Sequence, residues 1–209
     1  MNMPAVAITD IGNLMGAFHF VEAVNKYNKS LEEISGNPIK PIIGITLNVC
    51  ANHLDRSHRD DGFQIVLIAK NKNGYHNLAK LTSIAHTKGF YYVPRVDREL
   101  ILNYKEDIIV LTGNLYGEVP YKVLNVGAQQ AEDSLLWWKE HFGSDLYIEL
   151  MRHNQEDETR VNSTLVELAN KHGVKMIASN SCYYLKKEEA NAHDTVSYTH
   201  LRAHETSEN

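Results

Sequence analysis

The stretch Ala5-Val6-Ala7-Ile8-Thr9-Asp10-Ile11-Gly12-Asn13 contains the pattern that the rest of the chain repeats. An apolar run ends in Thr-Asp, a glycine turn follows, and apolar side chains then recur at helical spacing from Met15 to Tyr27. This order is typical of a buried strand that leads through a turn into a helix. In parallel α/β folds the chemistry is usually placed at the carboxyl ends of the strands, so Asp10 is a candidate functional residue.

Further apolar runs alternate with amphipathic segments along the chain. The expected strands are 41–49, 63–69, 108–112, 146–150 and 174–179, and the expected helices are 73–86, 118–125, 128–142, 159–172 and one that begins at 188. Residues 89–95 are expected to form an aromatic loop, and Asp97 to cap a short helix that contains Leu100 and Ile101. Continuously apolar strands predict a parallel sheet covered on both faces. A barrel and an open doubly wound sheet both fit this α/β pattern.

The composition limits the classes of function. The 209 residues are 43% hydrophobic and have a formal net charge of -5 at pH 7, which is typical of one globular domain without a general attraction to nucleic acid. Cys50 and Cys182 have no CxxC spacing and favour a reducing compartment. No apolar run approaches the roughly 20 residues of a membrane span, and we find no secretion signal, so a cytoplasmic protein is expected. No glycine-rich phosphate-binding loop is present.

Residues 195–209 depart from the alternating pattern. The run from Val196 to Glu205 reads as the translation of a common transposon-type sequencing adaptor. We therefore expect a non-native tail there, with a disordered native tail as the alternative, and exclude it from the fold. For the same reason, the metal-like spacing of His200 and His204 is not interpreted as a site.

Short motifs in a fixed order connect residues 4–194 to a known family. They are Ala5 to Asp10, Lys40-Pro41-Ile42-Ile43-Gly44, Leu67-Ile68-Ala69-Lys70-Asn71, Gly89-Phe90-Tyr91-Tyr92 with Pro94-Arg95-Val96-Asp97, Tyr147-Ile148-Glu149-Leu150 and Asn191-Ala192-His193-Asp194. The series resembles the N-terminal PHP domain of the bacterial DNA polymerase III alpha subunit. The resemblance implies a distorted (β/α)7 barrel rather than an open sheet. It also implies that residues 1–194 are a fragment of the domain that lacks its first strand, which carries a His-x-His motif in the family.

The resemblance further implies a metal cluster in active members of the family, held by His, Asp, Glu and Cys at the strand ends. The matching positions of this chain are Asp10, Ile11, Thr46, Gln64, Lys88, Asn114, Ser181 and Tyr183, and only Asp10 keeps a ligand of the family pattern. Isoleucine has no donor atom, and Lys88 would place a positive charge where cations bind. We therefore expect a degenerate site without a metal. A rearranged site of Glu149, His153 and Cys182 is the alternative.

The replacements suggest a polar network in place of the metal ions. Lys88 is expected to pair with Asp10, and Thr46, Gln64, Asn114 and Tyr183 are expected to hydrogen-bond among themselves. A fully satisfied network of this kind can occupy a former metal cavity.

The function implied by the resemblance lies in DNA replication. The missing ligands favour a non-catalytic structural and partner-docking module; a metal-dependent phosphoesterase or 3′–5′ proofreading exonuclease is the alternative. Expected partners are the rest of the alpha chain, the proofreading exonuclease subunit and other replisome components, with DNA contacted only in the full-length enzyme. That parent protein resembles a DNA-directed DNA polymerase, a nucleotidyltransferase that is expected to use Mg2+. The fragment lacks the polymerase active site and is expected to need no cofactor.

Two pairs of adjacent aromatic residues are candidates for packing on the domain or for contact with a partner. Trp137 and Trp138 are adjacent on an expected helix, so one is expected to face the core and the other to be available to a partner. Tyr91 and Tyr92, beside Arg95, are expected either to pack on the barrel rim or to stack on single-stranded DNA.

Overall fold

The computed structural model describes residues 3–32, 36–182, 184 and 186–195. The chain divides into two compact units, residues 1–178 and 179–209, which are described separately. The expected tail, 195–209, lies outside the described residues except for Thr195 and stays a prediction. In the described ranges, no helix has the length and apolar character needed to cross a membrane.

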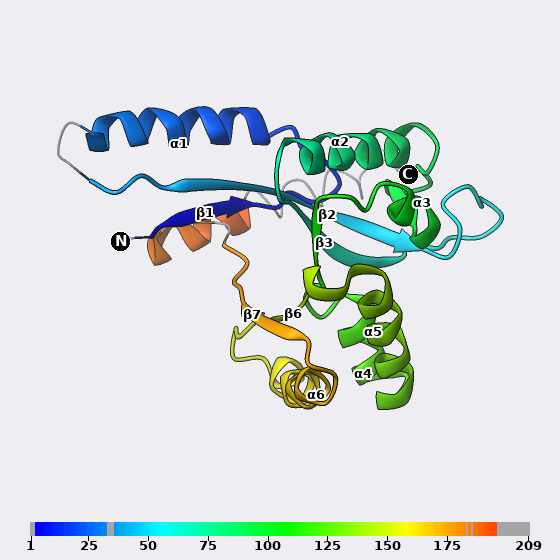
Figure 1. Ribbon diagram of the computed structural model, residues 1–209. Helices are drawn as coiled ribbons and strands as arrows, with labels where there is room; N and C mark the ends of the chain where they lie inside the picture. Colours follow the sequence, from blue (N-terminus) through cyan, green and yellow to red (C-terminus); the bar gives the residue numbers. More distant parts are fainter. Residues whose placement is uncertain (1–2, 33–35, 183, 185, 196–209) are drawn as a thin grey trace. The chain divides into compact units, whose positions relative to one another are not determined.

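The first unit is an α/β structure (Figure 1). Its strands are β1 (Ala5–Ile8), β2 (Lys40–Cys50), β3 (Phe63–Ala69), β4 (Arg95–Asp97), β5 (Ile108–Leu111), β6 (Leu146–Leu150) and β7 (Lys175–Ala178). Its helices are α1 (Ala17–Glu32), α2 (Lys72–Thr87), α3 (Arg98–Asn103), α4 (Glu118–Asn125), α5 (Ala128–Phe142), the 3-10 turn η1 (Gly143–Asp145) and α6 (Glu156–His172). The described part of the second unit contains the 3-10 turn η2 (Lys187–Glu189), which continues into helical residues 190–195.

The strands form one sheet in the order β1-β2-β3-β5-β6-β7, with β4 also paired to β2. The pairs β1–β2, β2–β4, β5–β6 and β6–β7 are parallel, whereas β3 runs antiparallel to both β2 and β5. The expectation of a wholly parallel sheet was therefore wrong. Its cause is the connection between β2 and β3, which is a loop rather than a helical crossover and so returns the chain in the opposite direction.

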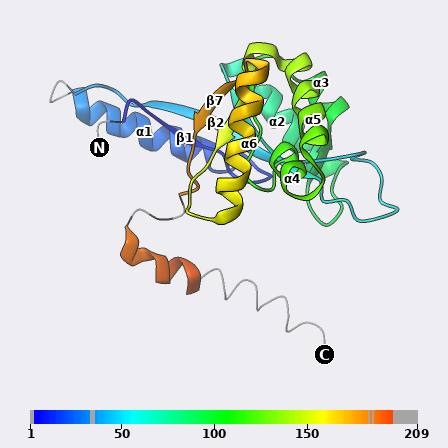
Figure 2. The ribbon, with the colours of Figure 1, turned by 90° about the horizontal axis from the view of Figure 1, so that it is seen from below.

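The sheet curls into a half-barrel with helices packed along it. Helix α2 contacts β2, β3 and β4, and α6 contacts β6 and β7. Figure 2 shows α4, α5 and α6 grouped beside one another in this unit. The arrangement confirms the expected α/β class and is that of a distorted PHP-type barrel.

The two faces of the sheet differ in burial. Ile45, Leu67, Val110 and Leu146 lie opposite one another on neighbouring strands and are at most 1% exposed. The helices cover this face, and the predicted apolar face of α2 (Leu78, Leu81 and Ala85) is confirmed as part of the core. On the opposite face, an apolar groove of about 870 Å3 is lined by side chains that include Ile68, Ile109, Leu111, Tyr147 and Ile177. Helix α1 lines the same groove through Ala17, Phe18 and Val21, so a helix covers part of this face.

The segment expected to be an aromatic loop ends in a strand, β4, whose first residue is a fully buried arginine. Arg95 is 0% exposed. Its guanidinium donates to the carbonyl oxygens of Asp55 at 2.7 Å, Asp60 at 3.0 Å and Gly89 at 3.2 Å. Hydrogen bonds to carbonyls replace the water that a buried cation loses. Arg95 therefore fixes the 51–62 loop against the sheet.

The last residue of β4 confirms a predicted cap. The Asp97 carboxylate accepts from the backbone N–H of Leu100 at 2.9 Å, at the start of α3. The same carboxylate accepts from the backbone N–H of His53 at 3.1 Å and bonds the His53 ring. Burial alone would raise the pKa of Asp97, but these hydrogen bonds lower it below its ordinary value. Asp97 thus joins the 51–62 loop to α3.

We expect Arg95→Met to lower the free energy of unfolding by about 3 kcal/mol, because several carbonyl oxygens lose a charged donor. Urea denaturation followed by circular dichroism measures this change. Arg56→Ala, an exposed arginine of the same loop, serves as control and should change stability by less than about 0.5 kcal/mol. Equal effects of the two substitutions would contradict the anchoring role of Arg95.

Candidate functional site

Thr46 joins β2 to the segment that follows β1. Its hydroxyl donates to the carbonyl oxygen of Thr9 at 3.0 Å, and its backbone N–H donates to the carbonyl oxygen of Asp10 at 3.0 Å. Its own carbonyl accepts from the N–H of Gly12 at 2.8 Å. The candidate positions Asp10, Ile11 and Thr46 are thereby brought together, and the Ile11 side chain is 56% exposed.

Gln64 and Asn114 belong to a second junction, between β3 and the turn before α4. The backbone N–H of Gln64 donates to the carbonyl oxygen of Tyr116 at 2.9 Å, and Gln64 forms an isolated parallel bridge with Gly117. The side-chain oxygen of Asn114 accepts from the N–H of Tyr116 at 2.9 Å, which stabilises the turn. Thr46 and Asn114 each bond to the backbone, and the expected side-chain network with Gln64 and Tyr183 stays a prediction, because Tyr183 lies outside the described residues.

Strand register places several of these positions on one face of the sheet. Thr46 lies opposite Val66, Val66 opposite Leu111, and Leu111 opposite Tyr147. Because alternate residues of a strand share a face, Gln64 and Glu149 lie on the same face as Thr46. This is the face of the apolar groove. The motif positions chosen from the sequence thus include residues that the fold gathers on one face of the sheet.

Glu149 and His153, which sequence analysis considered for a rearranged site, lie in and after β6. Glu149 is 5% exposed, and its backbone N–H donates to the Thr112 hydroxyl at 3.0 Å. The ring Nδ1 of His153 lies 2.6 Å from the Glu158 carboxylate, which also accepts from the backbone N–H of His153. Burial alone would raise the pKa of Glu158, but these bonds lower it. His153 therefore anchors the start of α6.

Lys88 does not make the predicted ion pair. It is exposed and ends α2, where its backbone N–H donates to the carbonyl oxygen of Ile84 at 2.8 Å. Between Lys88 and Asp10, both within the described part of the chain, there is no salt bridge. The predicted pairing was wrong because the end of α2 directs Lys88 to solvent.

The remaining candidate positions belong to the second unit. Ser181 and Cys182 are exposed, so the expectation of a packed Cys182 was wrong. Tyr183 lies outside the described residues. The proposed association of Cys182 with Glu149 and His153 therefore stays a prediction. The other cysteine, Cys50, is buried and donates to the carbonyl oxygen of Val96 at 3.3 Å; burial raises the pKa of its thiol to about 11.

The donor set does not fit the metal cluster that the family implies. Among the residues that the structure describes, no three His, Cys, Asp or Glu side chains converge on a point where they could hold an ion. Ile11 has no donor atom, and the Thr46 hydroxyl and Asn114 amide oxygen are engaged by the backbone. A hard divalent cation needs several oxygen or nitrogen donors to replace its water.

Sequence reasoning missed a dense network around Glu118. Its carboxylate accepts from Arg98 at 2.7 Å, Lys122 at 2.8 Å, Ser134 at 3.1 Å and the Trp138 indole N–H at 3.1 Å. Burial alone would raise the pKa of Glu118, but the hydrogen bonds from Arg98 and Lys122 lower it. The spacing of Glu118 with Lys122, and of Ser134 with Trp138, is one helical turn and could have indicated two facing helices.

The same network includes Trp138 and distinguishes its environment from that of Trp137. Trp138 is 2% exposed and belongs to the core, while Trp137 is only partly buried. The Arg98 guanidinium lies 4.1 Å from the centre of the Trp137 ring, and His141 stacks on that ring at 4.3 Å. The prediction that only one tryptophan faces the core is confirmed.

Comparisons with known proteins agree with this fold. The family described as PHP domain matches residues 1–153. The DNA polymerase III subunit alpha of Borreliella burgdorferi is 37% identical over 199 residues, which cover 93% of this chain and 16% of that protein. Those of Deinococcus radiodurans and Thermus aquaticus are 36% and 37% identical, over 92% of this chain and 14% and 15% of their own length. The chain thus spans a small part of each relative.

We expect Lys88→Ala to change the free energy of unfolding by less than about 0.5 kcal/mol, because no ion pair of this side chain is lost. Thermal or urea denaturation measures the change. A loss above about 1 kcal/mol would show that Lys88 has a structural partner after all.

We expect Glu118→Gln to lower the free energy of unfolding by about 2 kcal/mol at neutral pH, because a carboxylate with several donors becomes neutral. The contribution of the carboxylate is complete above its ordinary pKa of 4.5, and it is lost as the pH falls below that value. The difference between wild type and variant should therefore shrink in acid.

Urea denaturation at neutral pH and at about pH 3 measures both effects. The matched control is Glu140→Gln, an exposed residue of α5, which should be neutral at both pH values. A difference that persists unchanged in acid would contradict the role of the Glu118 charge.

Proposed function

This chain belongs to the PHP domain family, and we propose that it is the N-terminal PHP region of a replicative DNA polymerase III alpha subunit, acting as a non-catalytic structural and partner-docking module. Its expected partners are the rest of the alpha chain, the proofreading exonuclease subunit and other replisome components. Cytoplasmic localisation, and Mg2+ as the cofactor of the parent polymerase rather than of this region, belong to the same proposal.

The proposal rests on the contacts that this chain makes at the positions where the family resemblance implies metal ligands. Thr46 holds the segment after β1 through its hydroxyl and backbone, and Asn114 holds the turn before α4. Ile11 is apolar and largely exposed. Residues that stabilise the fold in this way are not available to bind and activate water at a metal, which hydrolysis of a phosphodiester requires.

The similarity to alpha subunits supports the replication context. The relatives described above are DNA polymerase III alpha subunits by name, and their similarity extends over more than nine-tenths of this chain. A region kept without its metal ligands, inside a much longer protein, is suited to hold neighbouring domains or subunits. Docking accounts for a fold that keeps its core while its ligand positions change.

The first test measures metal content and nuclease activity of the purified chain. We expect substoichiometric zinc, manganese or magnesium and no 3′–5′ cleavage of labelled single-stranded DNA with any of these ions, in wild type and in Asp10→Ala alike. Asp133→Ala, on α5, is the matched control. Tightly held metal ions with cleavage abolished only by Asp10→Ala would instead favour the alternative function, a 3′–5′ exonuclease or phosphoesterase.

The docking role is measured separately by co-elution with the proofreading exonuclease subunit of the same organism in size-exclusion chromatography. We expect a complex that forms without added metal. Absence of a complex at micromolar concentrations would contradict the docking role, whatever the result of the nuclease assay.

A further inference from the structure

A turn between α2 and β4 presents aromatic side chains to solvent. We call residues 89–95 the aromatic turn. Phe90 is 48% exposed and Tyr92 is 61% exposed. Tyr91 N–H donates to the carbonyl oxygen of Val93 at 3.1 Å, so Tyr92 lies at the apex of the turn. The turn thus presents two aromatic rings to solvent.

The backbone at the apex is strained. Tyr92 has a φ of +62°, in the left-handed region that bulky residues rarely adopt. Its neighbours hold it there: Arg95 is fully buried, and the Tyr91 ring lies 5.4 Å from the Arg95 guanidinium and 4.7 Å from the Tyr92 ring. A rigid base therefore supports an exposed ring, and strain of this kind is found mainly at functional sites.

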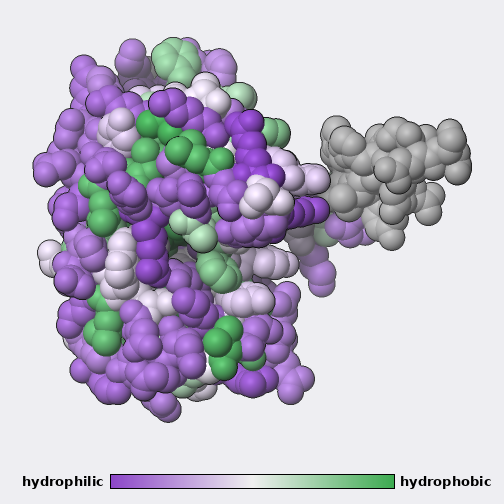
Figure 3. All heavy atoms as spheres, turned by 90° about the vertical axis from the view of Figure 1, so that its right-hand side faces the viewer, coloured by the Kyte–Doolittle hydropathy of each residue, from purple (hydrophilic) through white to green (hydrophobic). Residues whose placement is uncertain are grey.

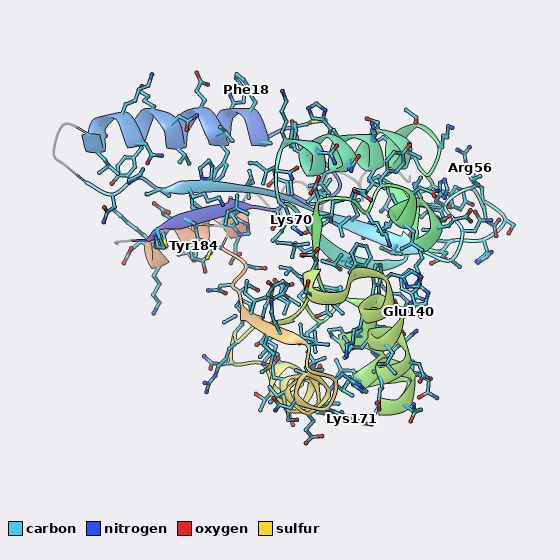
Figure 4. All side chains as sticks on the ribbon, viewed as in Figure 1. Phe18, Arg56, Lys70, Glu140, Lys171 and Tyr184 are labelled. Carbon is cyan, nitrogen blue, oxygen red and sulfur yellow. The ribbon has the colours of Figure 1, made fainter. Side chains whose placement is uncertain are left out.

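Two arginines of the 51–62 loop lie beside the aromatic turn. The Arg59 guanidinium lies 4.8 Å from the centre of the Tyr92 ring. Arg56 donates to the carbonyl oxygen of Lys88 at 3.3 Å, which brings Arg56 beside the exposed Lys88 at the start of the turn. Figure 3 looks onto the end of the molecule that carries the 51–62 loop, where hydrophilic residues predominate and hydrophobic ones form small groups. Figure 4 shows Arg56 in this outer loop.

The acidic residues of the same loop are largely engaged by local donors. Asp60 accepts from the backbone N–H groups of Ala51 and Gly62, each at 3.0 Å. Asp55 accepts from the N–H of Ser57 at 2.8 Å, and Asp61 pairs with Arg59 at 2.7 Å. Arg56 and Lys88 have no such carboxylate partner among the described residues. Arg56 and Lys88 are thus available to an anionic ligand, whereas Arg59 is held by Asp61.

We propose that the aromatic turn, with Arg56 and Lys88, binds single-stranded nucleic acid by stacking bases on Phe90 and Tyr92. Stacking on exposed aromatic rings combined with neighbouring cations for the phosphates is the general chemistry of such sites. The rings accept any base, so the site has little sequence preference. An apolar protein partner fits less well, because Arg56, Arg59 and Lys88 lie beside the same turn. The inference does not depend on the docking role proposed above.

Fluorescence anisotropy of a labelled oligo(dT) tests the proposal on the whole chain. We expect wild-type binding with a Kd below about 100 µM at roughly 50 mM salt, which weakens as salt rises. Tyr92→Leu and Phe90→Leu should each weaken binding at least fivefold, to about the extent measured for loss of one stacked base. Tyr92→Phe should retain binding, because the ring remains.

Matched controls lie on α1, away from the turn. Tyr27→Leu removes a ring of similar exposure (52%) and should leave binding unchanged. Lys88→Ala should weaken binding and reduce its salt dependence, whereas Lys29→Ala should do neither. A duplex of the same length should bind less tightly than the single strand, since its bases are already stacked.

Several results would overturn the proposal. They are absence of wild-type binding at low salt, equal effects of Tyr92→Leu and Tyr27→Leu, and tighter binding of the duplex than of the single strand. Unchanged binding when Tyr92→Leu and Phe90→Leu are combined would also overturn it, because the rings would then not contribute to binding. Circular dichroism of each variant verifies that the exposed substitutions leave the fold intact.

Discussion

The buried guanidinium of Arg95 is the interaction on which the arrangement of the first unit depends. An arginine without solvent is stable only if hydrogen-bond acceptors replace its water, and here the acceptors are backbone carbonyls of the 51–62 loop and of Gly89. The same short strand ends in Asp97, which binds His53 of that loop and caps α3. These bonds fix the 51–62 loop to the rest of the fold. The aromatic turn contacts this loop.

Backbone contacts connect the strand ends at the positions where the family resemblance implies metal ligands. A metal cluster connects strand ends by drawing several side chains to common ions. In this chain, Thr46 connects β2 directly to the residues after β1, and the turn at Asn114 is connected to β3 through Tyr116 and Gln64. These bonds join the same elements at their ends without charge. The connection between these strand ends therefore does not require a metal ion.

The local spacing of apolar residues predicted much of the fold, because each long helix or strand contains several repeats of its own hydrophobic period. The bounds of β3, β6, α4 and α5 agree with the apolar spacing, and the Asp97 cap follows from side-chain chemistry. The direction of β3 could not be predicted, because a run of apolar residues does not indicate whether the strand runs parallel or antiparallel to its neighbours. Strand β4 was missed because three residues show no period. The Glu118 network depends on residues that approach only when α3, α4 and α5 pack together.

Strand β2 is bonded to three others, with β1 and β4 sharing one edge and β3 on the opposite edge. Only β3 is its near neighbour in sequence; β1 and β4 are separated from it by a helix or more. Closing a short loop loses less chain entropy than closing a long one, so the β2–β3 hairpin can form early, whereas the shared edge must wait for distant segments. The order of events in folding is thus built into one strand. β1 is already synthesised when β2 emerges, but residues 48–50 of β2 keep an unpaired edge until residues 95–97 have been synthesised, and during that interval this edge is open to wrong pairing.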